Sequence, residues 1–445
     1  MRILIIGAGP TGLSTGRRLL ELGHDDFTIY EQHSYAGGLC ASFRDEQGFT
    51  WDLGGHVIFS QYPYFNQLFE SALHGQFYEH TRKAWIYFMD RWVPYPFQNN
   101  LRHLPREVIA KCVRDLRAAH RKNTSPENFK EWIMANMGEG IAQYFMLPYN
   151  EKVWAYPLED MSADWITERV SRPDVKEVVG LLISDKDRMD WGPNSIFKFP
   201  AEGGTGQIFH NVAAQLAQKI QFDTRVEEVD LIGKSVKLSN GARQGYDVLV
   251  NTSPLDLFTR MCAGAPASLT EWGEQLAHNR VWVVGVGLKK GALDEKSWGY
   301  FPQKDVPFFR ATYFSNYSPR NVPGPGYRSF LCETAYSEDS PFGKNQAVDT
   351  TIAGLLDTGL IAPEERSNIV STFSFDIPYA YPIPTLNREK VLARINPLLE
   401  EHGVFSRGRF GAWRYEVGNT DHSVMQGKEI ADRIVNGTTE TVWHG

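Results

Sequence analysis

The sequence of 445 residues contains only four cysteines, at Cys40, Cys112, Cys262 and Cys332. They are widely scattered and show neither the spacing of a metal site nor the density of a disulfide framework. No apolar run approaches the roughly 20 residues that a membrane helix requires. We therefore expect a cytoplasmic protein with reduced thiols, no bound metal and no membrane segment.

An excess of positive charge is also missing. The chain has 46 Lys and Arg against 53 Asp and Glu, a formal net charge of -7. Nothing in this balance attracts nucleic acid or an anionic membrane, and an anionic ligand must be held by local arginines. The sequence has no internal repeat and no low-complexity linker, and its length suffices for two or three packed domains.

The amino terminus has the pattern of a doubly wound βαβ unit. An apolar run at 2–6 predicts a buried strand, and we expect a helix over 11–22 and a second strand over 27–31. A GxGxxG motif follows the first strand, with its glycines at Gly7, Gly9 and Gly12. In this context the motif predicts a dinucleotide-binding turn.

Each residue type of this motif suits a bound dinucleotide. The first glycine permits the tight turn, the second lets a pyrophosphate approach the backbone, and the third allows close helix packing. Glu31, at the end of the second expected strand, can accept hydrogen bonds from a ribose. An acid at this position argues against a 2′-phosphate.

Two further segments favour FAD over NAD. Gly37 and Gly38 follow Glu31 in YAGGLCAS and are similar to the second glycine motif of FAD-binding flavoenzymes. Far downstream, YEVGNTDHS at 415–423 precedes a helix that we expect over 423–436. In flavoenzymes such a loop directs a helix amino terminus to the flavin pyrimidine, where its positive end stabilises an anionic reduced ring.

The remaining chain changes character twice. Helical spacing of apolar residues at 128–138 and 163–172 marks a helical region between about 100 and 190. Strand-like patterns run over 220–252, with a turn at 239–241, and over 280–335. We predict an α/β fold, in which a doubly wound, Rossmann-like FAD-binding domain carries a helical insertion and an antiparallel-sheet insertion.

The predicted division of the chain has three parts. The FAD-binding domain is discontinuous and comprises 1–80, 200–270 and 390–445. The helical domain for substrate and uridine covers 81–199, and the antiparallel-sheet domain covers 271–389.

Seven strings, in order and almost end to end, carry a family resemblance. They are GGHVIFS (54–60), WVPYPFQNN (92–100), PYNEKVWAYP (148–157), WGPN (191–194), FPAEGGTG (199–206), FFRATYFSNYSP (308–319) and RGRFGAWRYEVGNTDHS (407–423). With these strings the sequence closely resembles the UDP-galactopyranose mutase family, in its eukaryotic-type branch.

The resemblance implies an isomerase that interconverts UDP-galactopyranose and UDP-galactofuranose without net redox change. Reduced FAD acts through an N5–sugar adduct in that family, and the cofactor performs the hard chemistry while the protein orients the reactants. The reductant of the eukaryotic-type branch is NADPH or NADH. The preferred reductant, the sugar accepted and the oligomeric state stay open on the sequence.

Three residues are implied to act most directly. Arg310 and Arg409 match the two diphosphate-binding arginines of the family, where a guanidinium gives bidentate contacts and keeps its charge. His56 matches a loop residue that lies against the flavin, with its backbone carbonyl placed to accept the N5 proton. We predict that His56 tunes the flavin and does not serve as the general base.

The implied substrate-binding residues surround uridine, phosphates and sugar. They are Arg82, Tyr95, Phe97, Gln98, Phe145, Asn150, Trp154, Arg169, Asn194, Tyr300, Tyr381, Tyr415 and Asn419. The predicted cofactor-binding residues are Gly7, Gly9, Thr11, Gly12, Glu31, Gly38, Leu39, Gly55, His56, Val226, Gly418, Asn419, Asp421 and Ser423.

One position departs from the family. Gln61 stands where the eukaryotic-type branch has a second histidine after GGHVIFS, and glutamine cannot carry charge near neutral pH. This departure leaves open the same ring contraction on another nucleotide sugar. A flavin oxidoreductase of the amine-oxidase or protoporphyrinogen-oxidase kind, and a flavin-binding scaffold without catalysis, are the further alternatives.

Overall fold

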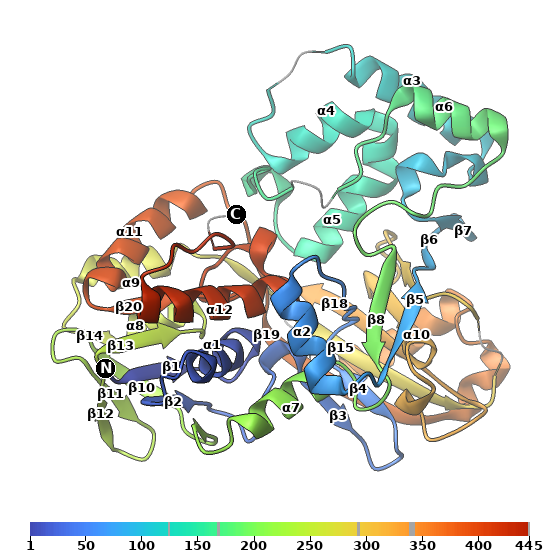
Figure 1. The fold of residues 1–445 in the computed structure, drawn as a ribbon. Helices are drawn as coiled ribbons and strands as arrows, with labels where there is room; N and C mark the ends of the chain where they lie inside the picture. The colour runs from blue at the N-terminus through green and yellow to red at the C-terminus, as the bar shows by residue number, and fades with distance from the viewer. Residues whose placement is uncertain (123–124, 167–169, 292–293, 338–342, 444–445) are drawn as a thin grey trace.

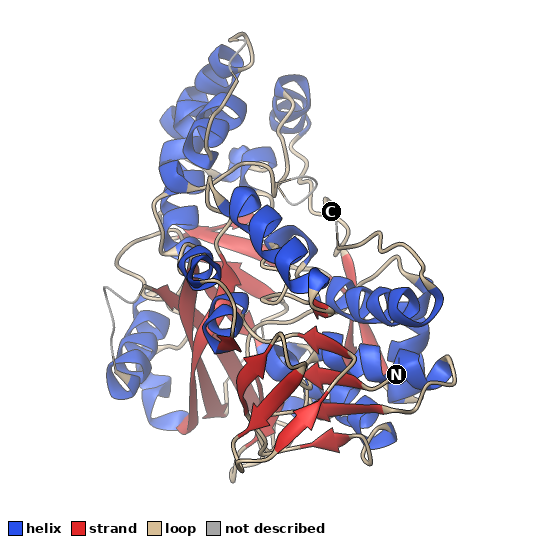
Figure 2. Ribbon diagram, turned by 90° about the vertical axis from the view of Figure 1, so that its left-hand side faces the viewer, coloured by secondary structure: helices blue, strands red, loops and turns tan. Residues whose placement is uncertain are grey.

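The computed structural model describes residues 1–122, 125–166, 170–291, 294–337 and 343–443. A parallel sheet with its helices, a larger mainly antiparallel sheet and a helical part make up the molecule (Figure 1). Figure 2 shows the helical part projecting beyond the strands of the sheets. The predicted α/β fold with a helical insertion and an antiparallel-sheet insertion is confirmed.

The parallel sheet is built from five short strands. In spatial order these are β20 (Val404–Ser406), β13 (Val248–Asn251), β1 (Ile3–Ile6), β2 (Phe27–Tyr30) and β9 (Ile220–Gln221). All four pairings are parallel. Every residue of β1 is buried, as expected for an apolar strand that is covered on both faces.

The two ends of the chain meet beside this sheet. Helix α1 (Pro10–Glu21) packs along α12 (Thr420–Asn436), and Ser14 Oγ donates to Val424 O at 2.7 Å. A Cβ on Gly427 would lie 2.3 Å from Thr11 O, so the close approach of the two helices requires glycine there. This packing brings the loop before α12 to the glycine motif.

Further helices pack around the parallel sheet and its surroundings. They are α2 (Pro63–Leu73), α7 (Gly206–Gln215), α8 (Leu255–Met261), α9 (Ala267–Gly273) and α11 (Arg388–Glu401). A core of Leu4, Leu249, Leu255, Leu269 and Val391 joins the last three to one face of the sheet, and α2 and α7 share the other core with α1.

Three small sheets connect these layers. A four-stranded sheet runs β12 (Arg243–Gly245), β11 (Ser235–Leu238), β10 (Val226–Asp230) and β14 (Cys262–Ala263). Two antiparallel pairs are β3 (Ser42–Arg44) with β4 (Thr50–Asp52) and β5 (Phe77–Thr81) with β8 (Ile196–Pro200).

The larger sheet has seven strands. In spatial order they are β19 (Ile369–Pro382), β15 (His278–Lys289), β18 (Tyr327–Tyr336), β17 (Arg310–Tyr313), β16 (Trp298–Tyr300), β6 (Ala84–Phe88) and β7 (Arg91–Pro94). All pairs are antiparallel except β16 with β6. Helix α10 (Lys344–Asp357) packs on β19 and β15.

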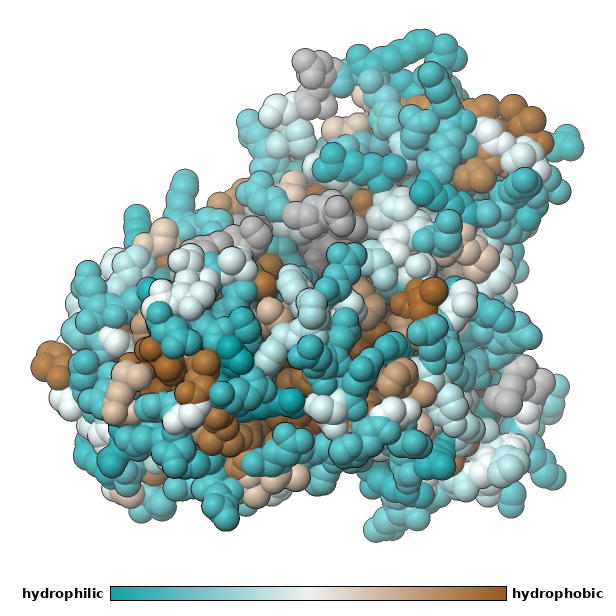
Figure 3. All heavy atoms as spheres, viewed as in Figure 1, coloured by the Kyte–Doolittle hydropathy of each residue, from teal (hydrophilic) through white to brown (hydrophobic). Residues whose placement is uncertain are grey.

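The helical part comprises α3 (Arg106–Ala119), α4 (Phe129–Ile141), α5 (Leu147–Trp154) and α6 (Val175–Ser184). Asn128 caps α4 by accepting from Glu131 N at 2.9 Å. Only Val178 of α6 is buried, and Ile183 is 82% exposed. Apolar side chains accordingly colour the surface over this helix in Figure 3.

The structure differs from two of the predicted elements. The described residues of the predicted helix at 163–172 are not helical, because Ser162 and Asp164 bond each other in a turn and Pro173 disfavours helix in the residue before it. The last helix begins at Thr420, three residues before the predicted start. Within the described ranges, no helix is long and apolar enough to cross a membrane.

Candidate active site

The glycine motif forms a tight turn between β1 and α1. Gly7 has φ +100° and its N–H donates to Tyr30 O at 2.8 Å. A Cβ on Gly12 would lie 2.0 Å from Gly7 O, whereas a Cβ on Gly9 would meet nothing nearer than Gly38 Cα at 4.0 Å. The two glycine segments thus leave bare backbone facing each other, which is what a pyrophosphate requires.

Glu31 follows β2 and is buried, at 6% exposure. Its Oε2 accepts from Ala8 N at 2.8 Å and its Oε1 from His33 N at 2.9 Å. A carboxylate has about four acceptor sites, so both oxygens retain capacity for ribose hydroxyls. Thr224 N donates to Glu31 O at 2.8 Å, and this bond ties the start of β10, with Val226, to the same position.

The loop before α12 completes the cofactor cradle. Asn419 is the N-cap of α12 and its carbonyl accepts from Ser423 N at 2.9 Å. Cys40, which follows Gly38 and Leu39, contacts Thr420 Oγ1 at 3.5 Å. The predicted cofactor residues Thr11, Gly418, Asp421 and Ser423 lie on these same segments, and Thr11, Asp421 and Ser423 are buried. The positive end of α12 therefore lies beside the glycine segments, where it suits a reduced flavin.

The GGH segment passes close to the seven-stranded sheet. A Cβ on Gly55 would lie 2.4 Å from Thr312 Oγ1, so only glycine fits there. Burial lowers the pKa of His56 to about 4, Glu333 opposes this shift, and the charges of Arg310 and Arg409 add to it. His56 is therefore a neutral imidazole at neutral pH. A neutral ring fits a residue that tunes the flavin, and it does not fit a residue that acts as a cationic acid.

Buried polar atoms in this region have no hydrogen-bond partner among the described residues; they include His56 Nδ1, Thr312 Oγ1 and Tyr317 Oη. Buried polar atoms in native proteins are almost always paired, so atoms of this kind indicate a polar ligand. An isoalloxazine ring carries both donors and acceptors along its edges. Together with the glycine cradle and Glu31, these atoms fit FAD.

Arg310 and Glu333 form the central ion pair of the site. They lie opposite each other on β17 and β18, and Arg310 Nη2 donates to Glu333 Oε1 at 2.7 Å while Nε binds Oε2. Burial disfavours the charge of Arg310, but Glu333 raises its pKa well above the ordinary value. Glu333 also accepts from Gly55 N at 3.4 Å, which links the pair to the GGH segment.

Arg409 enters the same region from the loop after β20. Its Nη1 donates to Gly418 O at 3.0 Å and its Nη2 to Ala380 O at 2.9 Å. The guanidinium lies 5.0 Å from the ring centre of Tyr381 and 5.7 Å from that of Tyr415. Arg409 is thus held by two backbone carbonyls and by the faces of two aromatic rings.

Aromatic rings connect the two arginines. The ring centre of Trp154 lies 4.9 Å from that of Tyr415 and 5.9 Å from that of Tyr381. The ring centres of Tyr95 and Tyr300 are 5.6 Å apart. Burial raises the pKa values of Tyr95, Tyr300 and Tyr381, so these phenols keep their protons and can donate to an anionic ligand.

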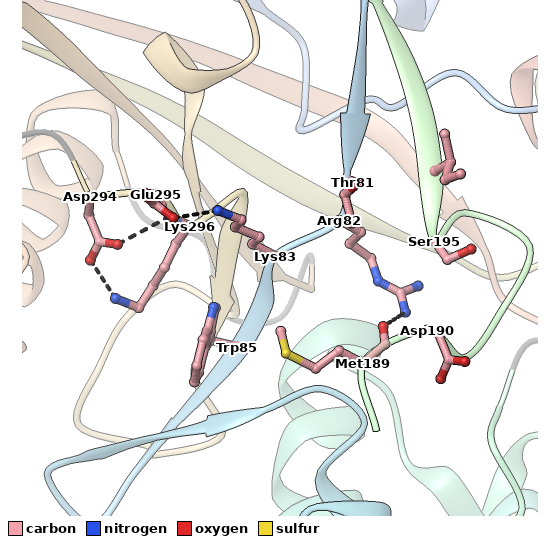
Figure 4. Close-up of a pocket in the computed structure, with 11 residues that line it drawn as sticks. Thr81, Arg82, Lys83, Trp85, Met189, Asp190, Ser195, Asp294, Glu295 and Lys296 are labelled. Atoms are coloured by element: carbon pink, nitrogen blue, oxygen red, sulfur yellow. Dashed lines mark hydrogen bonds and ion pairs between the residues drawn. The ribbon is translucent and has the colours of Figure 1, made fainter. Parts of the chain in front are cut away.

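Arg82 and Asn194 are in direct contact. Arg82 Nη1 donates to Asn194 Oδ1, and its Nη2 donates to Met189 O at 3.0 Å and to Trp191 O. Its guanidinium lies 5.1 Å from the Tyr95 ring centre. Figure 4 shows Arg82 directed at this segment, on the wall of a cavity of about 750 Å³ that Trp85 and Lys296 also line.

The residues predicted to receive uridine and sugar lie between α5 and the loop after β7. Phe97 is fully buried and stacks on Phe145 at 4.9 Å, so both rings belong to the helical core. Gln98 Nε2 donates to Ser171 O at 2.7 Å, while its Oε1 is buried and has no hydrogen-bond partner in the part of the chain that the structure describes. Asn150 Nδ2 donates to Met146 O at 2.7 Å. Arg169 lies outside the described residues.

Two residues of the site escaped the sequence reasoning. Glu333 is 4% exposed within the otherwise apolar strand YRSFLCETAY, and a buried acid in such a strand is the signal that marks it. The Trp165 ring centre lies 5.1 Å from that of Trp154 and 5.3 Å from that of Tyr415, and its buried Nε1 has no hydrogen-bond partner within the described ranges. Its helical spacing in the sequence gives no signal of a place in the site.

This fold and this site define a flavoprotein in which two arginines lie beside the cofactor cradle. The model of the family described as flavin containing amine oxidoreductase matches residues 10–433, so the chain belongs to that family. A solved structure of reduced UDP-galactopyranose mutase superposes with a TM-score of 0.96 and 40% identity, covering 99% of this chain and 95% of the other. The chain is a member of the UDP-galactopyranose mutase family.

More distant relatives share the fold or only a segment. A putative protoporphyrinogen oxidase from Exiguobacterium sp. 255-15 superposes with a TM-score of 0.75 at 15% identity, covering 97% of this chain and 98% of that one, which shows the fold alone. A 15-cis-phytoene desaturase from Synechococcus elongatus is 40% identical over 70 residues, or 16% of this chain and 15% of its own length. Curated relatives of this kind are thus matched over a small part of their length.

Proposed function

We propose that this protein is an isomerase that interconverts UDP-galactopyranose and UDP-galactofuranose with reduced FAD and without net redox change. The observation that carries the proposal is the convergence of two guanidinium groups beside the flavin cradle. Arg310 and Arg409 come from separate segments, yet the charges of both act on His56 and on Tyr381. An amine oxidase has no use for such a pair, whereas a departing diphosphate needs it.

Within the proposal, the arginines stabilise the leaving group. Negative charge grows on the diphosphate as the bond to the sugar breaks, and fixed guanidinium groups in a buried site stabilise that charge without reorganising. The protonated phenols of Tyr300 and Tyr381 add neutral donors. When bound, reduced FAD supplies the nucleophile toward the anomeric carbon.

Orientation and water exclusion fall to the surrounding rings and amides. Trp154, Tyr415 and Trp165 pack against each other beside Arg409 and limit the water that reaches the pocket. Among the described residues, Gln98 Oε1 and Asn99 Nδ2 are buried without hydrogen-bond partners, so together they offer one acceptor and one donor to the uracil edge. His56, as a neutral residue, tunes the flavin.

Three finer statements belong to the proposal. NADPH or NADH reduces the flavin, in keeping with the eukaryotic-type resemblance. The protein works in the cytoplasm, which suits its four unpaired cysteines. The division into a discontinuous FAD-binding domain (1–80, 200–270, 390–445), a helical domain (81–199) and a sheet domain (271–389) also stays a proposal.

Reductant stoichiometry tests the proposal against oxidoreductase chemistry. The FAD-loaded enzyme is reduced under nitrogen with one equivalent of dithionite and given a hundredfold excess of UDP-galactofuranose. We expect many sugars to convert per flavin while the flavin stays reduced by its absorbance. One sugar consumed per flavin reoxidised would contradict the proposal, and a parallel reduction with NADPH or NADH identifies the preferred reductant.

A further inference from the structure

The segment after α12, residues 437–443, folds back and inserts a buried carboxylate beside the arginine loop. The Glu440 side chain is 1% exposed and that of Arg407 is 0% exposed. Arg407 Nε donates to Glu440 Oε2 at 2.5 Å and Nη2 to Oε1 at 2.7 Å. The guanidinium also stacks 3.7 Å from the ring centre of Trp443 in the same segment.

This ion pair belongs to a balanced cluster of four charges. Glu400 accepts from Arg407 Nη2 at 2.9 Å and from Arg433 Nη2 at 2.8 Å, and Glu440 also accepts from Arg433 Nη1 at 2.8 Å. Burial opposes the charge of Glu440, yet the two arginines hold its pKa below the ordinary value. The Glu440 carboxylate is therefore charged at neutral pH. Arg407 Nε donates to Glu440, whereas Glu400 accepts from Arg407 only through Nη2.

The backbone from Arg407 to Arg409 has little freedom to absorb a shift. Arg407 N donates to Asn251 O at 2.9 Å, and Gly408 N donates to Gln426 Oε1 at 2.8 Å. Gly408 has φ +89°, and a Cβ on it would lie 2.6 Å from Thr11 Oγ1. A displacement of Arg407 is therefore passed along the packed turn to Arg409, two residues further on.

We propose that Glu440 is a positioning residue: through Arg407 it sets the place of Arg409 and thereby the affinity for the substrate diphosphate. The inference rests on the proposed function, which assigns Arg409 to that diphosphate. A glutamine at this position keeps one acceptor oxygen but sets an NH2 donor against the guanidinium, so one buried N–H of Arg407 loses its acceptor and the side chain moves toward water. A misplacement of about 1 Å in a binding group costs up to about a hundredfold in turnover.

Glu429, on α12, provides a matched control because it anchors the same segment. Its Oε2 accepts from Thr441 N at 2.7 Å and from Val442 N at 2.9 Å, so it also anchors residues 437–443. It holds them to α12, with no described bond to Arg407. The replacements Glu440→Gln and Glu429→Gln therefore remove anchors of one segment, and only the first touches the arginine.

The test measures UDP affinity by calorimetry and Tm on FAD-loaded enzyme. We expect Glu440→Gln to weaken UDP binding by about tenfold or more, and Glu440→Asp to recover part of the loss. Glu429→Gln should lower Tm and leave UDP affinity within about twofold, as for a substitution away from the site. Unchanged UDP affinity in Glu440→Gln, or equal losses in both Gln variants, would overturn the inference.

Hydrogen exchange of the unmodified enzyme decides the matter if Glu440→Gln does not fold. Coupling between two sites is reciprocal, so UDP must stabilise the docked segment if the segment favours UDP. We expect UDP to slow exchange at the amides of Thr441 and Val442, and no change there would overturn the inference. Failure of the unmodified enzyme to bind UDP at all would contradict the proposed function itself.

Discussion

Glu333 binds the guanidinium of Arg310 through both carboxylate oxygens, across neighbouring strands of the seven-stranded sheet. The same carboxylate accepts from Gly55 N at 3.4 Å, so it touches both the arginine and the loop that carries His56. A charge pair of this kind fixes a planar guanidinium in one orientation. The site therefore holds one arginine by a carboxylate and the other, Arg409, by carbonyls and rings.

Replacing Glu333 with Gln should lower kcat/KM for UDP-galactofuranose by about a hundredfold, because Arg310 loses the group that orients it. Loss of one partner from a buried ion pair also destabilises the fold by about 3 kcal/mol. Steady-state kinetics of the reduced enzyme and a denaturant titration measure the two effects. Asp376→Asn is the control, since Asp376 pairs with Arg280 across strands of the same sheet but outside the site. Equal losses of kcat/KM in both variants would contradict the assigned role.

Replacing either Arg310 or Arg409 with Lys should reduce kcat by about two to three orders of magnitude. Lysine retains the charge but not the planar fork that stabilises charge on the departing diphosphate. Arg320→Lys is the matched control, because Arg320 is 58% exposed and pairs with Glu202 on the surface. A loss confined to KM would show instead that the arginines bind ground state and transition state equally.

Lys152 gives the fold a pH dependence of known sign. Its Nζ donates to Phe301 O at 2.9 Å and to Gln303 O at 2.8 Å, and burial lowers its pKa to about 7 although Asp305 opposes the shift. Between pH 7 and about 10.4 the unfolded chain therefore holds the proton that the folded chain has released.

The free energy of unfolding should consequently rise with pH over that window, and Lys152 adds no slope below pH 7, where both states are protonated. Urea titrations between pH 7 and 10 measure the slope. In Lys152→Met this rise should be smaller by up to roughly 1.4 kcal/mol per pH unit. Identical slopes in the two proteins would show that Lys152 is not perturbed.

Replacing Gln61 with His restores the residue that the eukaryotic-type branch has at this position. Gln61 is exposed, and substitutions at exposed positions change free energies by about 0.5 kcal/mol. A change of about 0.5 kcal/mol corresponds to a factor of about two in a rate constant. We therefore expect kcat/KM for UDP-galactofuranose to stay within about twofold. A panel of nucleotide sugars checks specificity, and a new preference for another sugar in either protein would make Gln61 a specificity residue.

The cofactor cradle was accessible from the sequence because its requirements are local. Gly7 adopts φ +100°, and Gly12 leaves room for the backbone that packs against it. Both requirements call for glycine at a fixed spacing, which the sequence shows directly. The long-range partner of Gly7–Gly12, the loop at 415–419, was found by resemblance. Its contact with α1 depends on helix packing between residues about 400 positions apart.

The places of Glu333 and Trp165 in the site do not follow from the spacing of apolar residues. The function of Glu333 comes from strand register, which sets it opposite a residue 23 positions away. Trp165 has helical spacing in the sequence, but the bonds between Ser162 and Asp164 favour a turn that directs the ring to Trp154. The deciding contact is thus long-range for Glu333, whereas for Trp165 a local turn overrides the helical spacing.

The central claim is tested most directly by comparing reduced and oxidised enzyme on one substrate. Anaerobic, dithionite-reduced enzyme is incubated with UDP-galactofuranose, and UDP-galactopyranose is followed by anion-exchange chromatography, with oxidised enzyme as the control. We predict conversion by the reduced enzyme and none by the oxidised enzyme. No conversion by enzyme whose flavin is bound and fully reduced would contradict the account.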